Sequence, residues 1–135
     1  MNRDHLESML IRHEGMRNLP YVDSVGKITI GVGRNLTDDG LSQAEIGMLL
    51  DNDLDAVIRD LQSFDWFIGL SDARQQALCD MRFNLGHEGF RQFRKMSHAI
   101  AVNDFATAAS EMRNSQWAHQ VGARATELAQ MMEQG

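Results

Sequence analysis

The sequence predicts a mostly helical α+β protein with one small β-hairpin. Apolar residues recur at helical spacing over most of the 135 residues, whereas apolar and small residues alternate strictly only in residues 28–33. Pro20 is the only proline, and no repeat or low-complexity segment interrupts the chain. Hydrophobic residues make up 43% and charged residues 24%, the composition of an ordinary folded domain. We therefore expect one domain, built as two lobes that share a helix.

The first element is expected to be a helix that ends at Gly15. Asp4, with Glu7 three residues later, resembles a capping box in which Asp4 has the capping role. The helical period then continues through Leu6, Met9, Leu10 and His13. Gly15 is suited to a left-handed cap at the end of this helix.

A β-hairpin is expected over residues 21–36. Ile28, Ile30 and Val32 alternate with one threonine and two glycines, after a turn at residues 24–26. No other stretch shows this pattern, so we expect this hairpin to be the only sheet.

Helices are expected over the rest of the chain. Ser42 and Glu45 form a capping box ahead of an apolar stripe that runs to Leu61. A helix of about 20 residues is ~30 Å long and can join two lobes. Ser71 can cap a second long helix that Gly86 stops. Shorter helices follow, with breaks near Gly89, Asn103, Ser115 and Gly122.

Composition disfavours several classes of function. The formal net charge of −6 argues against non-specific nucleic-acid binding, which needs clustered Lys and Arg. No apolar run reaches the ~18 residues of a membrane span. The first five residues lack the basic and apolar regions of a signal peptide, so we expect synthesis in the cytoplasm. Cys79 is the only cysteine and is expected to lie in the core.

No metal ion or cofactor is predicted. Three aspartates at residues 51–55 resemble the start of a calcium loop, but the glycine and the final glutamate of such a loop are missing. His13 and His87 each precede a glutamate, as in zinc-protease motifs, but Arg17 and Arg91 stand where the second histidine is required. The hairpin glycines precede no long helix and therefore form no dinucleotide fingerprint.

Two carboxylates and a hydroxyl lie across the expected helix end and hairpin. Glu14 closes the first helix, where the negative end of the helix dipole favours a protonated carboxyl group. Asp23 lies at the start of the hairpin, where turn amides and Thr29 can hold it ionised. Cleavage of a glycosidic bond uses such a pair, one carboxyl group protonated and one ionised. A water held between Asp23 and Thr29 would attack the sugar from the face opposite Glu14.

The motifs HEGMR (residues 13–17), YVDSVG (21–26) and TIGVG (29–33) resemble the phage-type lysozymes, the T-even bacteriophage lysozyme family. The resemblance continues through residues 74–86, 114–117 and 124–125, so it covers nearly the whole chain. It implies a glycoside hydrolase of the lysozyme type, a muramidase that hydrolyses the β-1,4 bond between N-acetylmuramic acid and N-acetylglucosamine. On that reading Glu14 is the proton donor, Asp23 the nucleophile or water-activating base, and Thr29 positions the water.

The resemblance also implies substrate-binding residues and an architecture. Phe83 matches an aromatic cleft residue of the family. Asn84 stands where the family often has a Gln or Asn that faces the acetamido groups of the sugar. Arg124 matches an arginine near the catalytic glutamate. A lysozyme-like fold would form a single domain over residues 1–135. Its small lobe would cover about 14–50 with the hairpin, and its helical lobe about 62–135 plus the N-terminal helix. Arg34 departs from the family pattern, because a histidine is usual there.

The leading interpretation is a phage or prophage endolysin. Such a protein would be a monomeric, bacteriolytic and antimicrobial muramidase that binds peptidoglycan. It would stay in the host cytoplasm until a holin releases it to the cell wall or periplasm. Two alternatives stay open: a lytic transglycosylase, and a catalytically silent module that binds walls or forms part of a phage particle. A transglycosylase needs one Glu and no water-positioning pair, so the presence of Asp23 and Thr29 favours the hydrolase.

Overall fold

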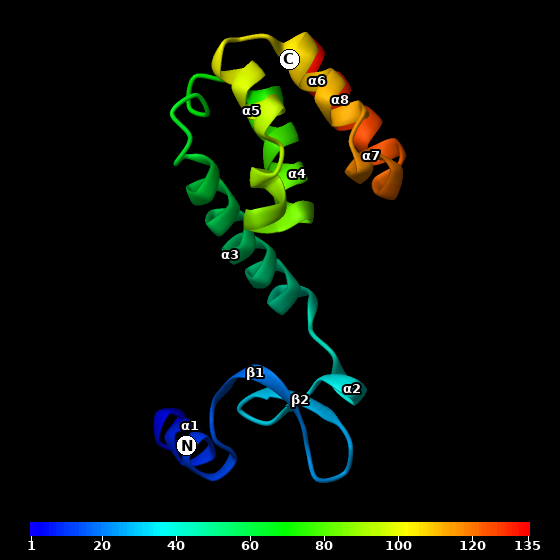
Figure 1. Ribbon diagram of the computed structural model, residues 1–135. Helices are drawn as coiled ribbons and strands as arrows, with labels where there is room; N and C mark the ends of the chain where they lie inside the picture. The colour runs from blue at the N-terminus through cyan, green and yellow to red at the C-terminus, as the bar shows by residue number, and fades with distance from the viewer. The chain divides into compact units, whose positions relative to one another are not determined.

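Eight helices and one three-stranded antiparallel sheet make up the chain, which confirms the predicted α+β, mostly α class (Figure 1). The computed structural model describes residues 1–135. The chain divides into a first unit, Met1–Met48, and a second unit, Leu49–Gly135. None of the helices combines the length and the hydrophobicity that a membrane span requires. The assignment of the N-terminal helix to the helical lobe stays a prediction.

The first unit holds the only sheet, as expected. Its elements are α1 (Arg3–Glu14), β1 (Arg17–Val22), β2 (Ile28–Gly31), β3 (Arg34–Asn35), α2 (Leu36–Asp39) and the start of α3 (Gln43–Leu61). The strand order is β1-β2-β3, so β1 is an edge strand. β1 begins at Arg17, earlier than the predicted hairpin, and its pairing with β2 is irregular between Arg17 and Tyr21. Pro20, which has no N–H to donate, is tolerated in that irregular edge segment.

The start of α1 differs from the prediction. The side chain of Asn2 accepts a hydrogen bond from the backbone N–H of His5 at 3.0 Å, so Asn2 is the N-cap. The predicted capping role of Asp4 is therefore wrong. Asn and Asp cap helices equally well, and Asn2 lies two residues before Asp4, so the helix begins earlier than predicted. Asp4 lies in the first turn instead, where its charge still suits the helix dipole. Gly15 ends α1 as expected, with φ of 79°.

The second unit is helical throughout. It contains the rest of α3, α4 (Asp72–Arg91), α5 (Arg94–Ala101), α6 (Phe105–Arg113), α7 (Gln116–Val121) and α8 (Ala123–Gln134). The Ser42–Glu45 capping box at the start of α3 and the Ser71 cap of α4 are confirmed. The predicted breaks at Asn103, Ser115 and Gly122 are confirmed as well.

Gly86 kinks α4 rather than stopping it. Its backbone is non-helical, with φ of 80° and ψ of 173°, but the helix resumes and continues to Arg91. The break expected near Gly89 therefore falls after Arg91. Gly89 itself lies inside the helix, where a Cβ would approach Leu85 to 3.3 Å, so its lack of a side chain serves close packing. Gly86 therefore interrupts the helical backbone, as a glycine with positive φ can, and Asp60 binds one arginine on each side of this kink.

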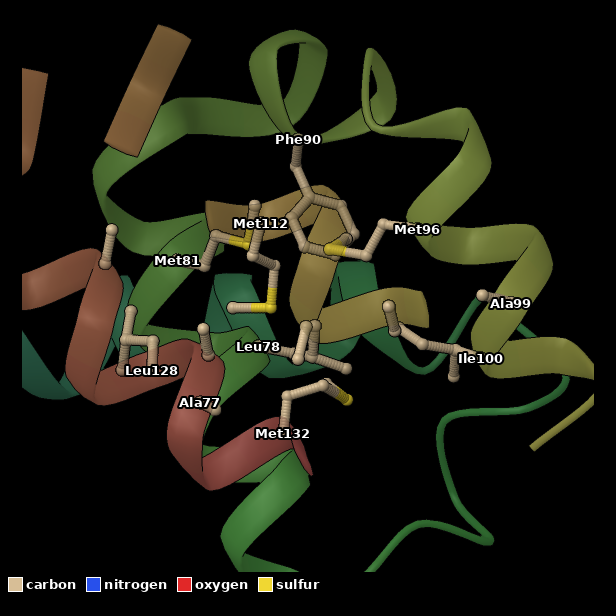
Figure 2. Packing of buried hydrophobic residues seen from close by; sticks show 14 of the residues in the cluster. Ala77, Leu78, Met81, Phe90, Met96, Ala99, Ile100, Met112, Leu128 and Met132 are labelled. Carbon is tan, nitrogen blue, oxygen red and sulfur yellow. The ribbon is translucent and has the colours of Figure 1, made fainter. Parts of the chain in front are cut away.

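The hydrophobic core lies in the second unit (Figure 2). Phe90 is fully buried in a cluster that also holds methionines from four helices, and the other large buried side chains are Leu61, Leu78 and Ile100. The buried methionines are Met81, Met96, Met112 and Met132. Met side chains are unbranched and adapt to irregular gaps, which suits a core assembled from short helices that meet at several angles. Each such side chain contributes about 1.5–3 kcal/mol by burial.

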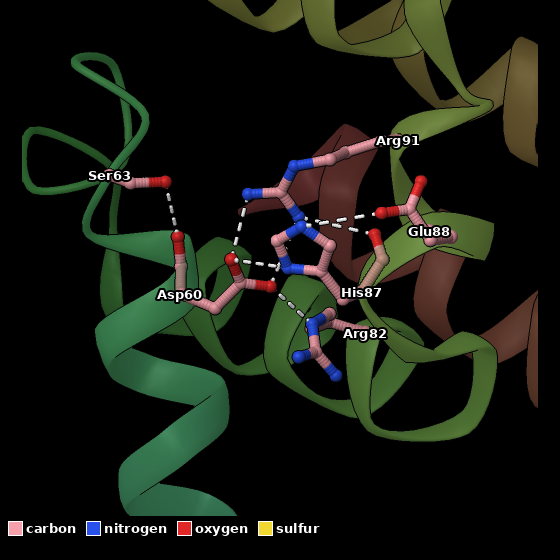
Figure 3. A network of polar contacts seen from close by, with 6 residues as sticks. All are labelled: Asp60, Ser63, Arg82, His87, Glu88 and Arg91. Atoms are coloured by element: carbon pink, nitrogen blue, oxygen red, sulfur yellow. Dashed lines mark hydrogen bonds and ion pairs between the residues drawn. The ribbon is translucent and has the colours of Figure 1, made fainter.

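A polar network joins the end of α3 to both sides of the Gly86 kink (Figure 3). The Asp60 carboxylate accepts hydrogen bonds from Arg82 before the kink and from Arg91 after it, and also pairs with His87 Nδ1 at 3.0 Å. The Asp60 side chain is only 12% exposed. Desolvation raises the pKa of Asp60, but the hydrogen bonds from Arg91 and Arg82 outweigh it and lower the pKa to about 2.

Candidate active site

Glu14 is the last residue of α1, and its carboxyl group lies against the hairpin. The N–H of Gly15 donates to the carbonyl of Ile11 at 2.8 Å and closes the helix directly behind it. A Cβ placed on Gly33, in the turn between β2 and β3, would lie 3.2 Å from Glu14 Oε2. The φ of Gly33 is 68°, so both the backbone conformation and the close approach favour glycine there. The structure thus brings the helix end and the TIGVG turn into contact.

Asp23 closes the turn between β1 and β2. Its Oδ1 accepts two backbone hydrogen bonds, from Val25 at 2.9 Å and from Lys27 at 2.8 Å. Its own N–H donates to the carbonyl of Lys27 at 2.9 Å. One carboxylate oxygen is therefore fixed by the turn amides, as the sequence predicted, and Oδ2 has no partner within the chain. An oxygen held in this way can accept a hydrogen bond from a bound water.

Thr29 is the only buried polar residue of the chain, with 4% exposure. Its hydroxyl donates to the carbonyl of Lys27 at 3.1 Å and keeps its acceptor lone pairs. Ile28, one residue earlier, is 49% exposed, as expected when neighbouring side chains of a strand point to opposite faces. No direct hydrogen bond joins Thr29 to Asp23. Both bind the backbone of Lys27 instead, an anchor that the sequence does not reveal because it uses no side chain.

A second feature not predicted from the sequence is the ion pair between Arg34 and Glu45. Arg34 Nη1 lies 2.8 Å from Glu45 Oε1 and donates to the carbonyl of Gly40 at 3.2 Å. The hydrogen bond from Arg34, followed by those from Ser42, lowers the pKa of Glu45 to about 2. The same contact raises the pKa of the Arg34 guanidinium. The departure of Arg34 from the histidine pattern was visible in the sequence, but its partner was not.

The three predicted substrate-binding residues lie in the second unit. Phe83 is 43% exposed and lines an apolar groove together with Arg124. Arg124 Nε donates to Asp80 Oδ1 at 2.7 Å, so the arginine has a partner inside its own unit. Asn84 does not line that groove; its Oδ1 accepts a hydrogen bond from Trp117 Nε1 at 2.8 Å. The roles of all three residues in substrate binding stay predictions.

The residues considered for metal binding have other surroundings. The three aspartates at 51–55 lie on α3, as expected for a charged helix face, and His87 contacts Asp60. No group of three or more His, Cys, Asp or Glu side chains is arranged to hold a metal ion. Cys79 packs against the core and is half-buried, and this burial raises the pKa of its thiol.

Comparison with known proteins adds independent evidence. The family model for phage lysozyme matches residues 11–132. Two proteins of Dictyostelium discoideum, probable T4-type lysozymes 1 and 2, are each 24% identical over 160 aligned residues, which cover 96% of this chain and 94% of the relative. The pre-baseplate central spike protein Gp5 of Enterobacteria phage T4 is 28% identical over 96% of this chain, but that match covers only 28% of Gp5.

The matched region includes all the predicted site residues, from Glu14 to Arg124. The aligned length of 160 exceeds the 135 residues of this chain, so the relatives carry segments that the chain lacks. The fold, the contact of Glu14 with the TIGVG turn and the family match agree. The chain belongs to the phage lysozyme family.

Proposed function

We propose that the chain is a muramidase that hydrolyses the β-1,4 bond between N-acetylmuramic acid and N-acetylglucosamine in peptidoglycan. The observation that carries the proposal is the arrangement within the first unit. Glu14 lies against Gly33 of the turn that follows Thr29, and Asp23 and Thr29 share the backbone of Lys27. Family membership supports the reaction class, and these contacts support the proposed roles.

In the proposed mechanism Glu14 donates its proton to the glycosidic oxygen as the bond breaks. Asp23 Oδ2 accepts a proton from a water that the Thr29 hydroxyl helps to hold, and this water attacks the anomeric carbon from the opposite face. The configuration at that carbon is inverted, which requires a carboxyl separation of about 6.5–9.5 Å to admit the water. The protons balance: Glu14 loses one to the leaving oxygen and Asp23 gains one from the attacking water. Asp23 then releases its proton to solvent, and Glu14 takes one up from solvent.

The test is clearing of chloroform-treated Gram-negative cells by the wild type, by Glu14→Gln and by Glu7→Gln. Glu7 lies on the same helix and pairs only with Arg3 on the surface, so Glu7→Gln is the matched control. We expect Glu14→Gln to lose at least ~10²-fold in rate, the usual contribution of a positioned general acid. Equal clearing by Glu14→Gln and the wild type contradicts the proposal. Products with 1,6-anhydro ends, instead of products that gained water, would identify a transglycosylase.

The biological setting has two candidates. The matches to two T4-type lysozymes, which cover 94% of each relative, favour a separate lytic enzyme, and we propose an endolysin that a holin releases. The match to the spike protein Gp5 favours a lysozyme unit of a phage particle. Mass spectrometry of purified virions separates the two: an endolysin is found in the lysate and is absent from washed particles.

A further inference from the structure

The turn that contacts Glu14 is short and is formed largely by glycine. Ile30 pairs with Arg34 across β2 and β3, so residues 31–33 form the whole connection. Gly31 and Gly33 both have φ of 68°. Glycine has the greatest backbone freedom of all residues, so this turn needs contacts from outside to keep one conformation. The position of Gly33 matters because its backbone lies close to the Glu14 carboxyl group and limits where that group can lie.

Arg34 provides such a contact directly after the turn. Its guanidinium reaches both carboxylate oxygens of Glu45, at 2.8 Å and 2.7 Å, and the carbonyl of Gly40. Together with the turn residues 31–33, Arg34 and Glu45 line one hollow of the first unit. The hydrogen bond to Glu45 Oε1, the ion-pair contact with Oε2 and the hydrogen bond to Gly40 together restrict the arginine more than a single contact would.

Glu45 is itself held by the backbone of α3. The N–H of Ser42 donates to Glu45 Oε1 at 2.9 Å, and the N–H of Glu45 donates to Ser42 Oγ at 3.1 Å. This reciprocal capping box fixes the carboxylate relative to the start of the helix. A continuous series of contacts therefore runs from α3 through Glu45 and Arg34 to Gly33, and from there to Glu14.

We propose that Arg34 is a positioning residue for Glu14: its ion pair with Glu45 fixes the turn that places Gly33 against the Glu14 carboxyl group. The inference rests on the proposed function of Glu14 as the proton donor. Arg34 does not touch the reacting atoms; it acts through the backbone of the turn.

The test compares Arg34→Gln and Glu45→Gln with Arg113→Gln and Glu133→Gln. The Arg113–Glu133 pair is matched in geometry and exposure: its N–O distance is 2.8 Å and its side chains are 41% and 45% exposed, against 2.7 Å, 40% and 38% for Arg34 and Glu45. Each substitution removes one half-exposed ion pair, but only the Arg34–Glu45 pair adjoins the Gly33 turn. Thermal unfolding of all four variants confirms that they fold.

We expect Arg34→Gln and Glu45→Gln to lower kcat about tenfold on purified peptidoglycan with KM within about twofold, because a small displacement of a catalytic group is costly in rate. The alkaline limb of the kcat pH profile, which reports the proton donor, should move in both variants but in neither control. Arg34→Lys, which keeps the charge but not the fixed geometry of the guanidinium, should restore part of the loss. Equal kcat for the two pairs, or an unmoved alkaline limb, overturns the inference.

A second readout is independent of activity. The carboxyl carbon resonance of Glu14, assigned by its loss in Glu14→Gln, should shift in Arg34→Gln and stay unchanged in Arg113→Gln. An inactive wild type would refute the proposed function, whereas an unchanged Glu14 resonance in Arg34→Gln would refute the positioning role. The two failures are therefore distinguishable.

Discussion

Asp60 offers the sharpest test of how the second unit is stabilised. Asp60→Asn keeps the shape of the side chain but removes the negative charge that Arg82 and Arg91 share. The side chains of Arg82 and Arg91 are only 15% and 28% exposed, so the remaining cations would be poorly solvated. Breaking a buried ion pair by removing one partner costs about 3–5 kcal/mol, and surface pairs contribute about 0–1 kcal/mol. The free energy lost when Asp60 is removed from its partly buried network should lie between these limits.

The lowered pKa of Asp60 gives a second value for its contribution to the free energy of unfolding. A carboxyl group whose pKa falls from 3.8 to about 2 on folding contributes about 2.5 kcal/mol at neutral pH. Because the folded pKa is the lower one, this contribution is complete well above pH 3.8 and is lost as the pH falls through 2. By pH 3 about half of it should remain. Since the network lies near the surface and is partly screened, we expect Asp60→Asn to cost about 2 kcal/mol at pH 7.

Urea unfolding followed by tryptophan fluorescence measures this cost. Both tryptophans, Trp66 and Trp117, belong to the second unit, so the signal reports the unit that contains the network. Glu133→Gln, which removes a half-exposed pair, should change the free energy of unfolding by less than about 1 kcal/mol. A loss below about 0.5 kcal/mol for Asp60→Asn at pH 7, or a difference from wild type that does not shrink towards pH 3, would refute the reasoning.

Three further predictions concern the turn, the core and the charge. Gly33→Ala should lower activity at least about tenfold and cost about 1–2 kcal/mol, because its φ is positive and its Cβ would press on Glu14; turbidity clearing and urea unfolding measure the two effects. Leu78→Ala should cost about 3–5 kcal/mol in urea unfolding, since Leu78 is completely buried, whereas Ile46→Ala at an exposed site should cost far less. With a net charge of −6, KM for an anionic wall should not rise between about 10 mM and 150 mM NaCl; a steep rise would show that attraction dominates.

The parts of the fold that the sequence predicted correctly depend on contacts between near neighbours. The caps at Ser42 and Ser71 each need one side chain and a backbone N–H three residues later, so a short window contains the whole signal. At the amino terminus the Asp4–Glu7 spacing satisfied the same rule and gave the wrong cap, because Asn2 with the N–H of His5 satisfies it as well. Gly86 shows a related limit, because tertiary contacts determine whether a glycine stops a helix or kinks it.

The Asp60 network shows what lay beyond the sequence pattern. Asp60, Arg82 and Arg91 are far apart along the chain and each, taken alone, looks like a charged residue on a helix surface. Only the packing of α3 against α4 brings their charges together. The Arg34–Glu45 pair was missed for the same reason. Long-range ion pairs leave no pattern in the sequence, whereas hydrophobic stripes have a period and caps have a fixed short spacing.

The two halves of the candidate site therefore have different origins. Asp23 and Thr29 are held by hydrogen bonds to the backbone of a single turn, so residues 23–29 carry their own geometry. The Glu14 half depends on a contact between a helix end and a distant glycine, and on whatever fixes that glycine. A turn of this kind needs few specific side chains, because most of its hydrogen-bonding groups belong to the backbone. The acid half therefore needs contacts from further along the chain, and the contact that we propose for this role comes from Arg34.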